Sequence, residues 1–268
     1  MTKELAGRVA FVTGSGRGLG FTIADRLAEL GADVAIHDMD WKAPAKYGEA
    51  TDLDEVAARL SRHGGRVAAV AGNIGDRDAV ARMKAEIEQK LGQVQILVNC
   101  AGGDIGAAGG KPNPNNALDI PFEDVQALTT SNLVGTILVC KTFCTGMRDR
   151  GRGAVVNIAS AAAHMGCSNG AIYATLKAAV VHYTRCLALE LQPFGVRVNA
   201  VSPGPSKTAR FVATRVVDPA MMEAPGSLIR YAEPGEIADA VAFLAGPQSK
   251  FVHGQVLRVD GGITLYPG

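Results

Sequence analysis

Short apolar runs alternate along the chain with longer stretches in which apolar residues recur every three or four positions. The runs are continuously apolar, which is typical of strands that helices cover on both faces. They predict strands at Val9–Thr13, Val34–His37, Val67–Ala71, Ile96–Asn99, Val155–Ile158, Val196–Val201 and Val256–Val259. The longer stretches predict helices at Leu19–Leu30, Leu53–Arg62, Arg77–Leu91, Phe122–Arg148, Ala171–Leu191 and Glu233–Leu244. This alternation predicts an α/β fold with a doubly wound, seven-stranded parallel sheet.

Two stretches interrupt the alternation. Residues 102–121 are rich in Gly, Pro and Asn, and residues 203–230 begin with Pro-Gly-Pro and are only weakly periodic. Both follow predicted strands, so we expect long loops at the carboxyl end of the sheet, where ligands bind in open α/β folds. No shift in composition divides the chain, and we expect residues 1–268 to form a single domain.

Composition and charge exclude several classes of partner. The chain has 268 residues and a formal net charge of +1, with 27 basic and 26 acidic residues and no long run of one sign. Neither nucleic acid nor an anionic membrane is therefore an expected partner. We find no signal peptide and no apolar run long enough to cross a bilayer. The five cysteines form no Cys-x-x-Cys pair, which favours small core residues in a reduced, cytoplasmic protein over metal or redox sites.

A glycine-rich turn lies between the first predicted strand and the first predicted helix. It comprises Gly14, Ser15, Gly16, Arg17, Gly18, Leu19 and Gly20. Free N–H groups and the positive end of the helix dipole bind a pyrophosphate, and glycines let it approach the backbone. The spacing from Thr13 is Thr-Gly-x-x-x-Gly-x-Gly, not the common Gly-x-Gly-x-x-Gly. Such a turn can also simply pack a helix on a strand, but its context favours a dinucleotide site in a Rossmann fold.

Two charged residues bear on the choice of dinucleotide. Asp38 ends the second predicted strand, eighteen residues after Gly20. A carboxylate there accepts a hydrogen bond from the adenosine ribose and repels a 2′-phosphate. Arg17 has the opposite effect, since a guanidinium attracts that phosphate. We expect Asp38 to lie directly at the ribose and to outweigh Arg17, which predicts NAD over NADP; the alternative for Asp38 is a solvated loop carboxylate.

Ser160, Tyr173 and Lys177 form a candidate catalytic group. Tyr173 and Lys177 lie one turn apart on a predicted helix, and Ser160 follows a predicted strand. A free tyrosine has a pKa of about 10, but a nearby ammonium stabilises the phenolate and lowers that pKa. The pair therefore predicts an acid/base, with the serine hydroxyl holding the substrate oxygen. A Tyr-x-x-x-Lys also arises by chance on a helix surface, and the serine and the glycine turn favour catalysis over that alternative.

Taken together, these motifs resemble those of the short-chain dehydrogenase/reductase family over nearly the whole chain. Ser160 stands thirteen residues before the Tyr-x-x-x-Lys of Tyr173 and Lys177, as in that family, and Asn132 matches the family's helix asparagine. The resemblance implies a catalytic tetrad formed by these four residues. The chain departs from the family at Cys100, which replaces the second Asn of Asn-Asn-Ala-Gly.

The resemblance also implies a role for each residue. Tyr173 is the acid/base, and Lys177 lowers its pKa and bonds the nicotinamide ribose. Ser160 orients the alcohol or carbonyl oxygen, and Asn132 holds a water that links the lysine to solvent. Asn73 stands where the family often has Asp against the adenine. Besides the glycine turn, Tyr173 and Lys177, further cofactor contacts are implied at Asn73, Ile74, Asn99, Ala101, Gly102, Pro203, Gly204 and Thr208. Hydride moves between a nicotinamide and a carbinol carbon, and no metal is needed.

The substrate is indicated only in outline. Candidate substrate contacts are Ser160, Tyr173 and His164, and a purely structural histidine is the alternative for the last. Residues 102–121 include the polar Asp104, Lys111, Asn113 and Asn115, which predicts a lid or wall of a polar pocket. We therefore predict an NAD(P)-dependent oxidoreductase that acts on a small secondary alcohol or ketone, polar or sugar-like.

Two other functions remain open. One is a 3-oxoacyl thioester reductase, but positions where such enzymes carry basic docking residues fall on Phe194 and near Gly151. The other is a catalytically silent nucleotide-binding protein, which the intact Tyr and Lys disfavour. The resemblance further implies a homotetramer that pairs through the helices Phe122–Arg148 and Ala171–Leu191.

Overall fold

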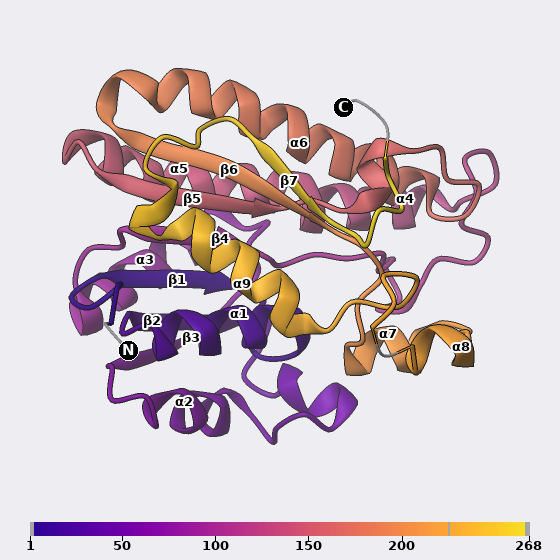
Figure 1. The fold of residues 1–268 in the computed structure, drawn as a ribbon, viewed down its shortest axis with the longest axis horizontal. Coiled ribbons are helices and arrows are strands. Elements are labelled where there is room, and N and C mark those ends of the chain that lie inside the picture. Colours follow the sequence, from indigo (N-terminus) through magenta and orange to yellow (C-terminus); the bar gives the residue numbers. More distant parts are fainter. Residues whose placement is uncertain (1–2, 225, 266–268) are drawn as a thin grey trace.

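The computed structural model describes residues 3–224 and 226–265, and its centre is a sheet of seven parallel strands (Figure 1). The strands are β1 (Val9–Thr13), β2 (Asp33–Asp38), β3 (Val67–Ala71), β4 (Ile96–Asn99), β5 (Gly153–Ile158), β6 (Val196–Pro203) and β7 (Val256–Val259). Their order is β3-β2-β1-β4-β5-β6-β7. The order reverses at β1, and the carboxyl ends of strands beside such a reversal are where ligands bind. The predicted fold class and strands are confirmed, with ends that differ by at most two residues.

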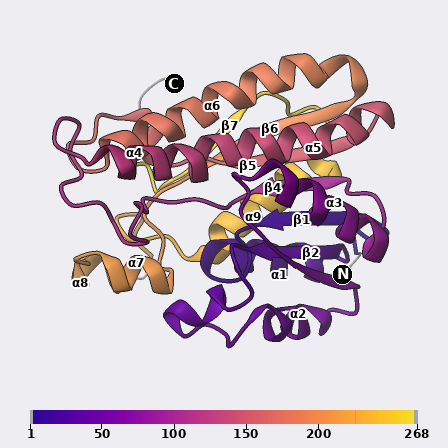
Figure 2. The same ribbon diagram turned by 180° about the vertical axis from the view of Figure 1, so that it is seen from behind.

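Helices cover both faces of the sheet (Figures 1 and 2). One face carries α1 (Gly18–Glu29), α2 (Leu53–Ser61) and α9 (Pro234–Ala245). The other carries α3 (Arg77–Leu91), α5 (Gly135–Asp149) and α6 (Ala171–Leu191). Apolar residues of the strands and helices form a separate buried cluster on each face. The strands are therefore buried on both sides, as their continuous apolar runs predict.

One helix is long enough to raise the question of a membrane. It consists of α4 (Phe122–Thr129), a π-helical turn (Thr130–Val134) and α5, and it was predicted as one helix. It has 28 residues and an apolar window of mean hydropathy 1.2, so by length and composition alone it meets the criterion for a spanning helix. The expectation that no run is long enough is wrong in this respect. Core helices of soluble proteins pass the same test, and 44% of the window is buried inside the molecule.

The two predicted loops lie at the carboxyl ends of the strands and differ in content. Residues 102–121 contain no helix or strand. Residues 203–230 contain two short helices, α7 (Ala209–Thr214) and α8 (Pro219–Met222), which the weak periodicity did not predict. Figure 1 shows α7 and α8 beyond the carboxyl ends of the strands, at the end of the sheet where the glycine turn also lies.

Candidate active site

The glycines of the turn between β1 and α1 differ in their surroundings. A Cβ on Gly20 would lie 2.1 Å from the carbonyl oxygen of Gly14, and a Cβ on Gly14 would lie 2.7 Å from the Cα of Ala101. These two glycines therefore permit close packing within the turn and against the segment after β4. Gly18 has a φ of +53°, and a Cβ there would meet nothing nearer than Thr208 at 3.6 Å. The space on the Cβ side of Gly18 therefore lets a pyrophosphate approach the start of α1, where the Gly18 N–H donates to Glu49 in this structure.

Two buried side chains support this turn, His37 on β2 and Ser15 in the turn itself. Nδ1 of His37 accepts a hydrogen bond from the Gly14 N–H at 3.1 Å, and its Nε2 lies 2.9 Å from the carbonyl oxygen of Gly72. Burial lowers the pKa of His37, so the neutral ring donates from Nε2. The Ser15 hydroxyl donates to the Val12 carbonyl at 2.7 Å. The hydroxyl of this predicted cofactor residue is thus used inside the turn, and His37 was not singled out from the sequence.

Asp38 and Arg17 lie beside each other at the end of β2. An Asp38 carboxylate oxygen is 3.9 Å from Nε of Arg17, and a Cβ on Gly16 would lie 2.7 Å from the same oxygen. Arg17 also donates to the carbonyl of Ala43 at 2.6 Å and lies over the ring of Tyr47, 5.2 Å from its centroid. The two residues with opposite expected effects on a 2′-phosphate are therefore close together, and Arg17 is held by three partners.

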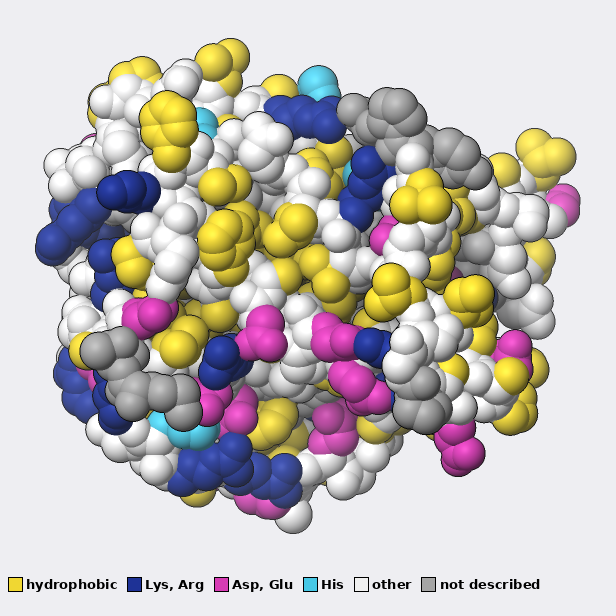
Figure 3. All heavy atoms as spheres, in the orientation of Figure 1, with side chains coloured by type: hydrophobic (Ala, Val, Ile, Leu, Met, Phe, Trp, Pro, Cys, Tyr) yellow, Lys and Arg dark blue, Asp and Glu magenta, His cyan; other side chains and the backbone are white. Residues whose placement is uncertain are grey.

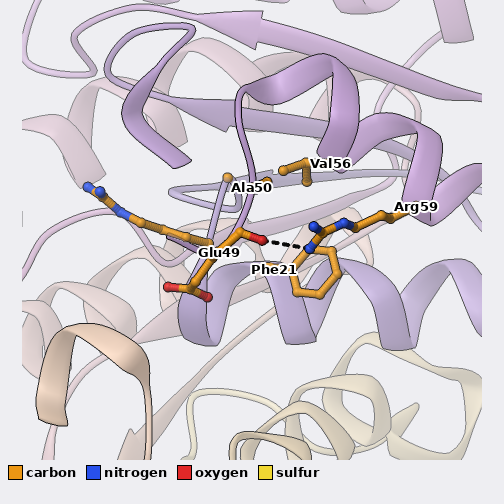
Figure 4. Close-up of a pocket in the computed structure, with 7 residues that line it drawn as sticks. Phe21, Glu49, Ala50, Val56 and Arg59 are labelled. Carbon is orange, nitrogen blue, oxygen red and sulfur yellow. Dashed lines mark hydrogen bonds between the residues drawn. The ribbon is translucent and has the colours of Figure 1, made fainter. Parts of the chain in front are cut away.

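A second carboxylate, which the sequence did not single out, lies at the same turn. Glu49 accepts a hydrogen bond from the backbone N–H of Gly18 at 2.7 Å, and its other oxygen is buried without a partner among the described residues. Its carbonyl accepts from Arg59 at 2.7 Å, and Figure 4 shows the carboxylate pointing away from that guanidinium. Glu49 also lines a cavity of about 190 Å³ with Phe21 and Val56. Negative charge thus lies at the positive end of α1.

Three other predicted cofactor residues lie at the carboxyl ends of β3 and β4. Asn99 is buried, and its amide donates to Oδ1 of Asn157 at 2.8 Å. Asn73 is exposed, and its Oδ1 accepts from the Gly75 N–H at 2.8 Å, while Ile74 is buried. Both asparagines bond within the protein, and their contacts to a cofactor stay predictions.

The segment after β4 is fixed to the dinucleotide turn. The Thr13 hydroxyl accepts hydrogen bonds from the N–H groups of Cys100 at 3.0 Å and Ala101 at 3.1 Å. Gly102 has a φ of +120°, and a Cβ there would lie 2.6 Å from Oδ1 of Asn132. The predicted cofactor residues Ala101 and Gly102 are therefore held between the turn and the long helix.

The segment after β6 contributes the remaining predicted cofactor residues. Pro203 ends β6, and the Gly204 N–H donates to the Val259 carbonyl at 2.9 Å. The Thr208 hydroxyl accepts from the Phe211 N–H at 3.2 Å and so caps α7. The side chain of Thr208 is also the nearest neighbour of the Cβ position of Gly18. Thr208 therefore lies opposite the start of α1.

The structure brings Tyr173, on the first turn of α6, together with Ser160 at the end of β5. Burial is the main influence on the phenol and raises the pKa of Tyr173, while the Ser160 hydrogen bond and the charges of Arg210 and Arg215 lower it. The net direction is upward, opposite to the sequence-based prediction. Lys177 is not among the groups that lower this pKa, so desolvation of the phenolate outweighs the favourable contacts.

Lys177 is buried one turn further along α6. Its Nζ donates to the Ile158 carbonyl at 2.9 Å and lies 5.7 Å from the centroid of the Tyr173 ring. Burial lowers the pKa of Lys177 from an ordinary 10.5 to about 8, and the adjoining Cys100 thiol raises it. The ammonium is thus directed at the end of β5. With a pKa of about 8, it remains charged at neutral pH.

Asn132 is fully buried in the π-helical turn, a kind of irregularity that is frequent at functional sites. Its amide donates to the Gly103 carbonyl at 2.9 Å, and its Oδ1 accepts from the Gly103 N–H at 2.9 Å. Asn132 therefore joins the long helix to the segment after β4. The water that it was predicted to hold beside Lys177 stays a prediction.

His164 is placed less favourably for the substrate. Its Nε2 lies 2.9 Å from the Ser202 hydroxyl of β6. Desolvation lowers the pKa of His164, and so does the charge of Arg258. This bond to the sheet supports the structural alternative for the histidine.

Arg210 reaches the site from α7 and was not singled out from the sequence. Its Nη1 lies 3.3 Å from the Gly102 carbonyl oxygen, and a Cβ on Gly103 would lie 2.8 Å from it. Its charge lowers the pKa of Tyr173. The direction of this side chain depends on α7, a helix that no sequence pattern indicated.

A dinucleotide turn at the switch point, with the half-buried Ser160 and Tyr173 and the buried Lys177 beside it, defines a nicotinamide-dependent oxidoreductase. A family model described as "Enoyl-(Acyl carrier protein) reductase" matches residues 14–264, and the chain belongs to the short-chain dehydrogenase/reductase family. Its chemistry is NAD(P)-dependent oxidation or reduction at a CH–OH group.

Individual relatives match over almost their whole length. Cyclohexanol dehydrogenase of Rhodococcus sp. is 34% identical over 267 residues, which cover 97% of each chain. The 3-oxoacyl-[acyl-carrier-protein] reductase of Synechocystis sp. is 33% identical over 269 residues, 98% of this chain and 99% of the relative. A structure of 7 alpha-hydroxysteroid dehydrogenase complexed with NADH and 7-oxo glycochenodeoxycholic acid is 30% identical, with a TM-score of 0.83 and coverage of 97% and 96%.

Proposed function

We propose that this protein is an NAD-dependent dehydrogenase of small, polar secondary alcohols that also reduces the corresponding ketones. The position of the Tyr173 phenol carries the proposal: Ser160 lies beside it and lowers its pKa, Lys177 lies one turn away on α6, and the glycine turn is nearby. Family membership establishes the NAD(P)-dependent chemistry, and the choice of NAD and of substrate goes beyond it.

The chain's own residues handle the proton. The bound nicotinamide supplies a hydride acceptor or donor for the carbinol carbon. In oxidation, Tyr173 takes the proton of the alcohol while Ser160 holds its oxygen. In reduction, the phenol gives a proton to the ketone oxygen. Because burial raises the pKa of Tyr173, the phenol keeps its proton at neutral pH, which favours reduction there and oxidation at alkaline pH.

Charge at the dinucleotide turn supports NAD. The carboxylate of Asp38 adjoins the turn at the end of β2, and Arg17 is engaged by Asp38, the Ala43 carbonyl and the Tyr47 ring. A 2′-phosphate beside Asp38 would face like-charge repulsion, which costs on the order of several kcal/mol.

Polar groups near the phenol support a hydroxylated substrate. The Asn115 amide donates to both Asp104 oxygens, at 3.1 and 2.9 Å, and Nζ of Lys111 lies 3.8 Å from that carboxylate. The charge of Asp104 raises the pKa of Tyr173, so this group is near the reacting atoms. The backbone carbonyl of Asn115 accepts from the Gly170 N–H at 2.7 Å, which ties the loop to the start of α6.

Initial rates with a panel of substrates test this function. We expect NADH to be oxidised with small cyclic and linear ketones faster than with acetoacetyl thioesters, and NADPH to serve at least about tenfold worse. Faster turnover of the thioester would support the alternative reductase. Tight NADH binding without turnover of any ketone or alcohol would support a silent nucleotide-binding protein.

We also propose a homotetramer in the cytoplasm. Large apolar side chains are exposed on the long helix and α6, including Val134 at 38% and Leu189 at 73%. Others are exposed on the face that carries β7 and α9 (Figure 3), including Leu257 at 38% and Phe243 at 42%. Copies of the chain that cover these faces would remove apolar surface from water. Light scattering in solution tests the tetramer, since a monomer would contradict it.

A further inference from the structure

The guanidinium of Arg210 has donors that the protein does not use. An arginine offers five N–H groups. Within the described residues, this side chain makes one hydrogen bond, from Nη1 to the Gly102 carbonyl at 3.3 Å. No carboxylate of residues 3–224 or 226–265 forms an ion pair with it. Two other arginines of this end of the sheet do pair with a carboxylate, Arg17 with Asp38 and Arg230 with Glu236. The exposed Arg215, at the end of α7, lies over the ring of Phe211.

The backbone makes room for this guanidinium. Gly103 has a φ of +146°, and a Cβ there would lie 2.8 Å from Nη1 and 3.0 Å from Nη2 of Arg210. Any side chain at this position would therefore displace the arginine. Gly103 is also the residue that Asn132 holds through two hydrogen bonds, so the charge rests on a rigid part of the site.

The surroundings place this charge near the reaction and leave it without a counterion. The charge of Arg210 lowers the pKa values of both Tyr173 and Lys177, so it is felt at the acid/base group. The carboxylate of Asp104 is next along the chain, but it is engaged by the Asn115 amide and by Lys111. An anion that enters beside the phenol would thus find Arg210 available.

We propose that Arg210 binds a carboxylate of the substrate, so that the preferred substrates are hydroxy acids and their oxo acids rather than neutral alcohols. This inference rests on the proposed oxidoreductase function and names the substrate class of the same site. The planar fork of a guanidinium donates two parallel hydrogen bonds to a carboxylate, which a neutral hydroxyl does not match. The carboxylate would fix the distance between the anchor and the carbinol carbon beside Tyr173.

Matched acids and esters test the proposal. The probes are 4-hydroxycyclohexanecarboxylate and 3-hydroxybutyrate, each against its methyl ester, with NAD⁺. Arg210→Gln should lower the ratio of kcat/KM for acid over ester by about 10- to 100-fold, because a charge-assisted bidentate contact is lost. Arg210→Lys should keep part of the ratio. Lys141→Gln removes a charge from an exposed side chain of α5 that does not influence the pKa of Tyr173 or Lys177, and it should leave the ratio within about threefold.

A binding measurement keeps the test independent of turnover. Titration of the enzyme–NADH complex with the same acids and esters, followed by NADH fluorescence, should show the same acid preference and its loss in Arg210→Gln. If no alcohol is oxidised, the proposed function fails. The ratio of acid to ester affinity for the enzyme–NADH complex still decides the role of Arg210. An ester that binds the wild type as well as its acid overturns the proposal. So does an Arg210→Gln variant that loses NADH affinity with an unchanged ratio, because the guanidinium then serves the cofactor's pyrophosphate.

Discussion

Replacing Lys177 with methionine is expected to stabilise the folded protein while removing its activity. The side chain is 5% exposed, and burial lowers its pKa from 10.5 to about 8. A difference of about 2.5 between folded and unfolded pKa values corresponds to roughly 3.4 kcal/mol of cost for the ammonium in the fold. Loss of the bond from the charged ammonium to the Ile158 carbonyl offsets about 1.5–3 kcal/mol. The expected net gain is therefore about 1 kcal/mol at pH 7.

The same linkage fixes the pH dependence. The folded pKa of Lys177 lies below the unfolded one, so the lysine is protonated in both states below about pH 8 and the wild type bears the full cost. Between about 8 and 10.5 the folded state loses the proton first, and the stability of the wild type rises with pH because the unfolded state binds more protons. The advantage of Lys177→Met should shrink across this window.

Urea denaturation of cofactor-free protein at equal chain concentrations measures this effect. Lys177→Met should unfold at higher urea than the wild type at pH 7, with a much smaller difference at pH 10. The exposed Lys141→Met serves as the control and should change little at either pH. A Lys177→Met variant that is less stable at pH 7, or a difference that does not vary with pH, would refute the reasoning.

Four further substitutions test other parts of the site. Asp38→Ala should raise kcat/KM with NADP⁺ by about tenfold or more, because it removes a repelling carboxylate; an unchanged NADP⁺ rate contradicts this. Gly20→Ala, whose Cβ would lie 2.1 Å from a carbonyl oxygen, should leave little folded protein. Gly18→Ala should lower the free energy of unfolding by only about 1–2 kcal/mol. Equal losses of stability for the two glycine variants in thermal unfolding would argue against both predictions. Ser160→Ala should move the alkaline limb of alcohol oxidation to higher pH, because its bond lowers the pKa of Tyr173; a pH profile with an unmoved limb counts against that role.

Regular elements were predictable because their signal is local. Continuous apolar runs marked all strands of the sheet, and helical periodicity marked every helix that packs on it. The short helices α7 and α8 lie outside the sheet and expose much of their surface, so they carry no such periodicity. The side chain of Arg210 takes its direction from α7, and for this reason the sequence did not indicate it.

Tertiary contacts account for what the motifs did not predict. The spacing of Tyr173 and Lys177 predicted a helix pair, and the structure has it. The spacing did not indicate the burial that raises the pKa of the Tyr173 phenol. It also did not indicate that the Ile158 carbonyl accepts a hydrogen bond from the Lys177 ammonium. His37 and Glu49 come from segments distant in sequence from the glycines that they contact, so no local pattern connects them to the turn.

The central claim is that the hydroxyl of Tyr173 exchanges the proton of the substrate, and the Tyr173→Phe variant tests it most directly. The measurement is kcat for NAD⁺ reduction with a saturating alcohol, together with the dissociation constant of NADH. We predict that kcat falls by about 10²- to 10⁴-fold while NADH binds as in the wild type. Turnover that stays within a few-fold of the wild type would contradict the account.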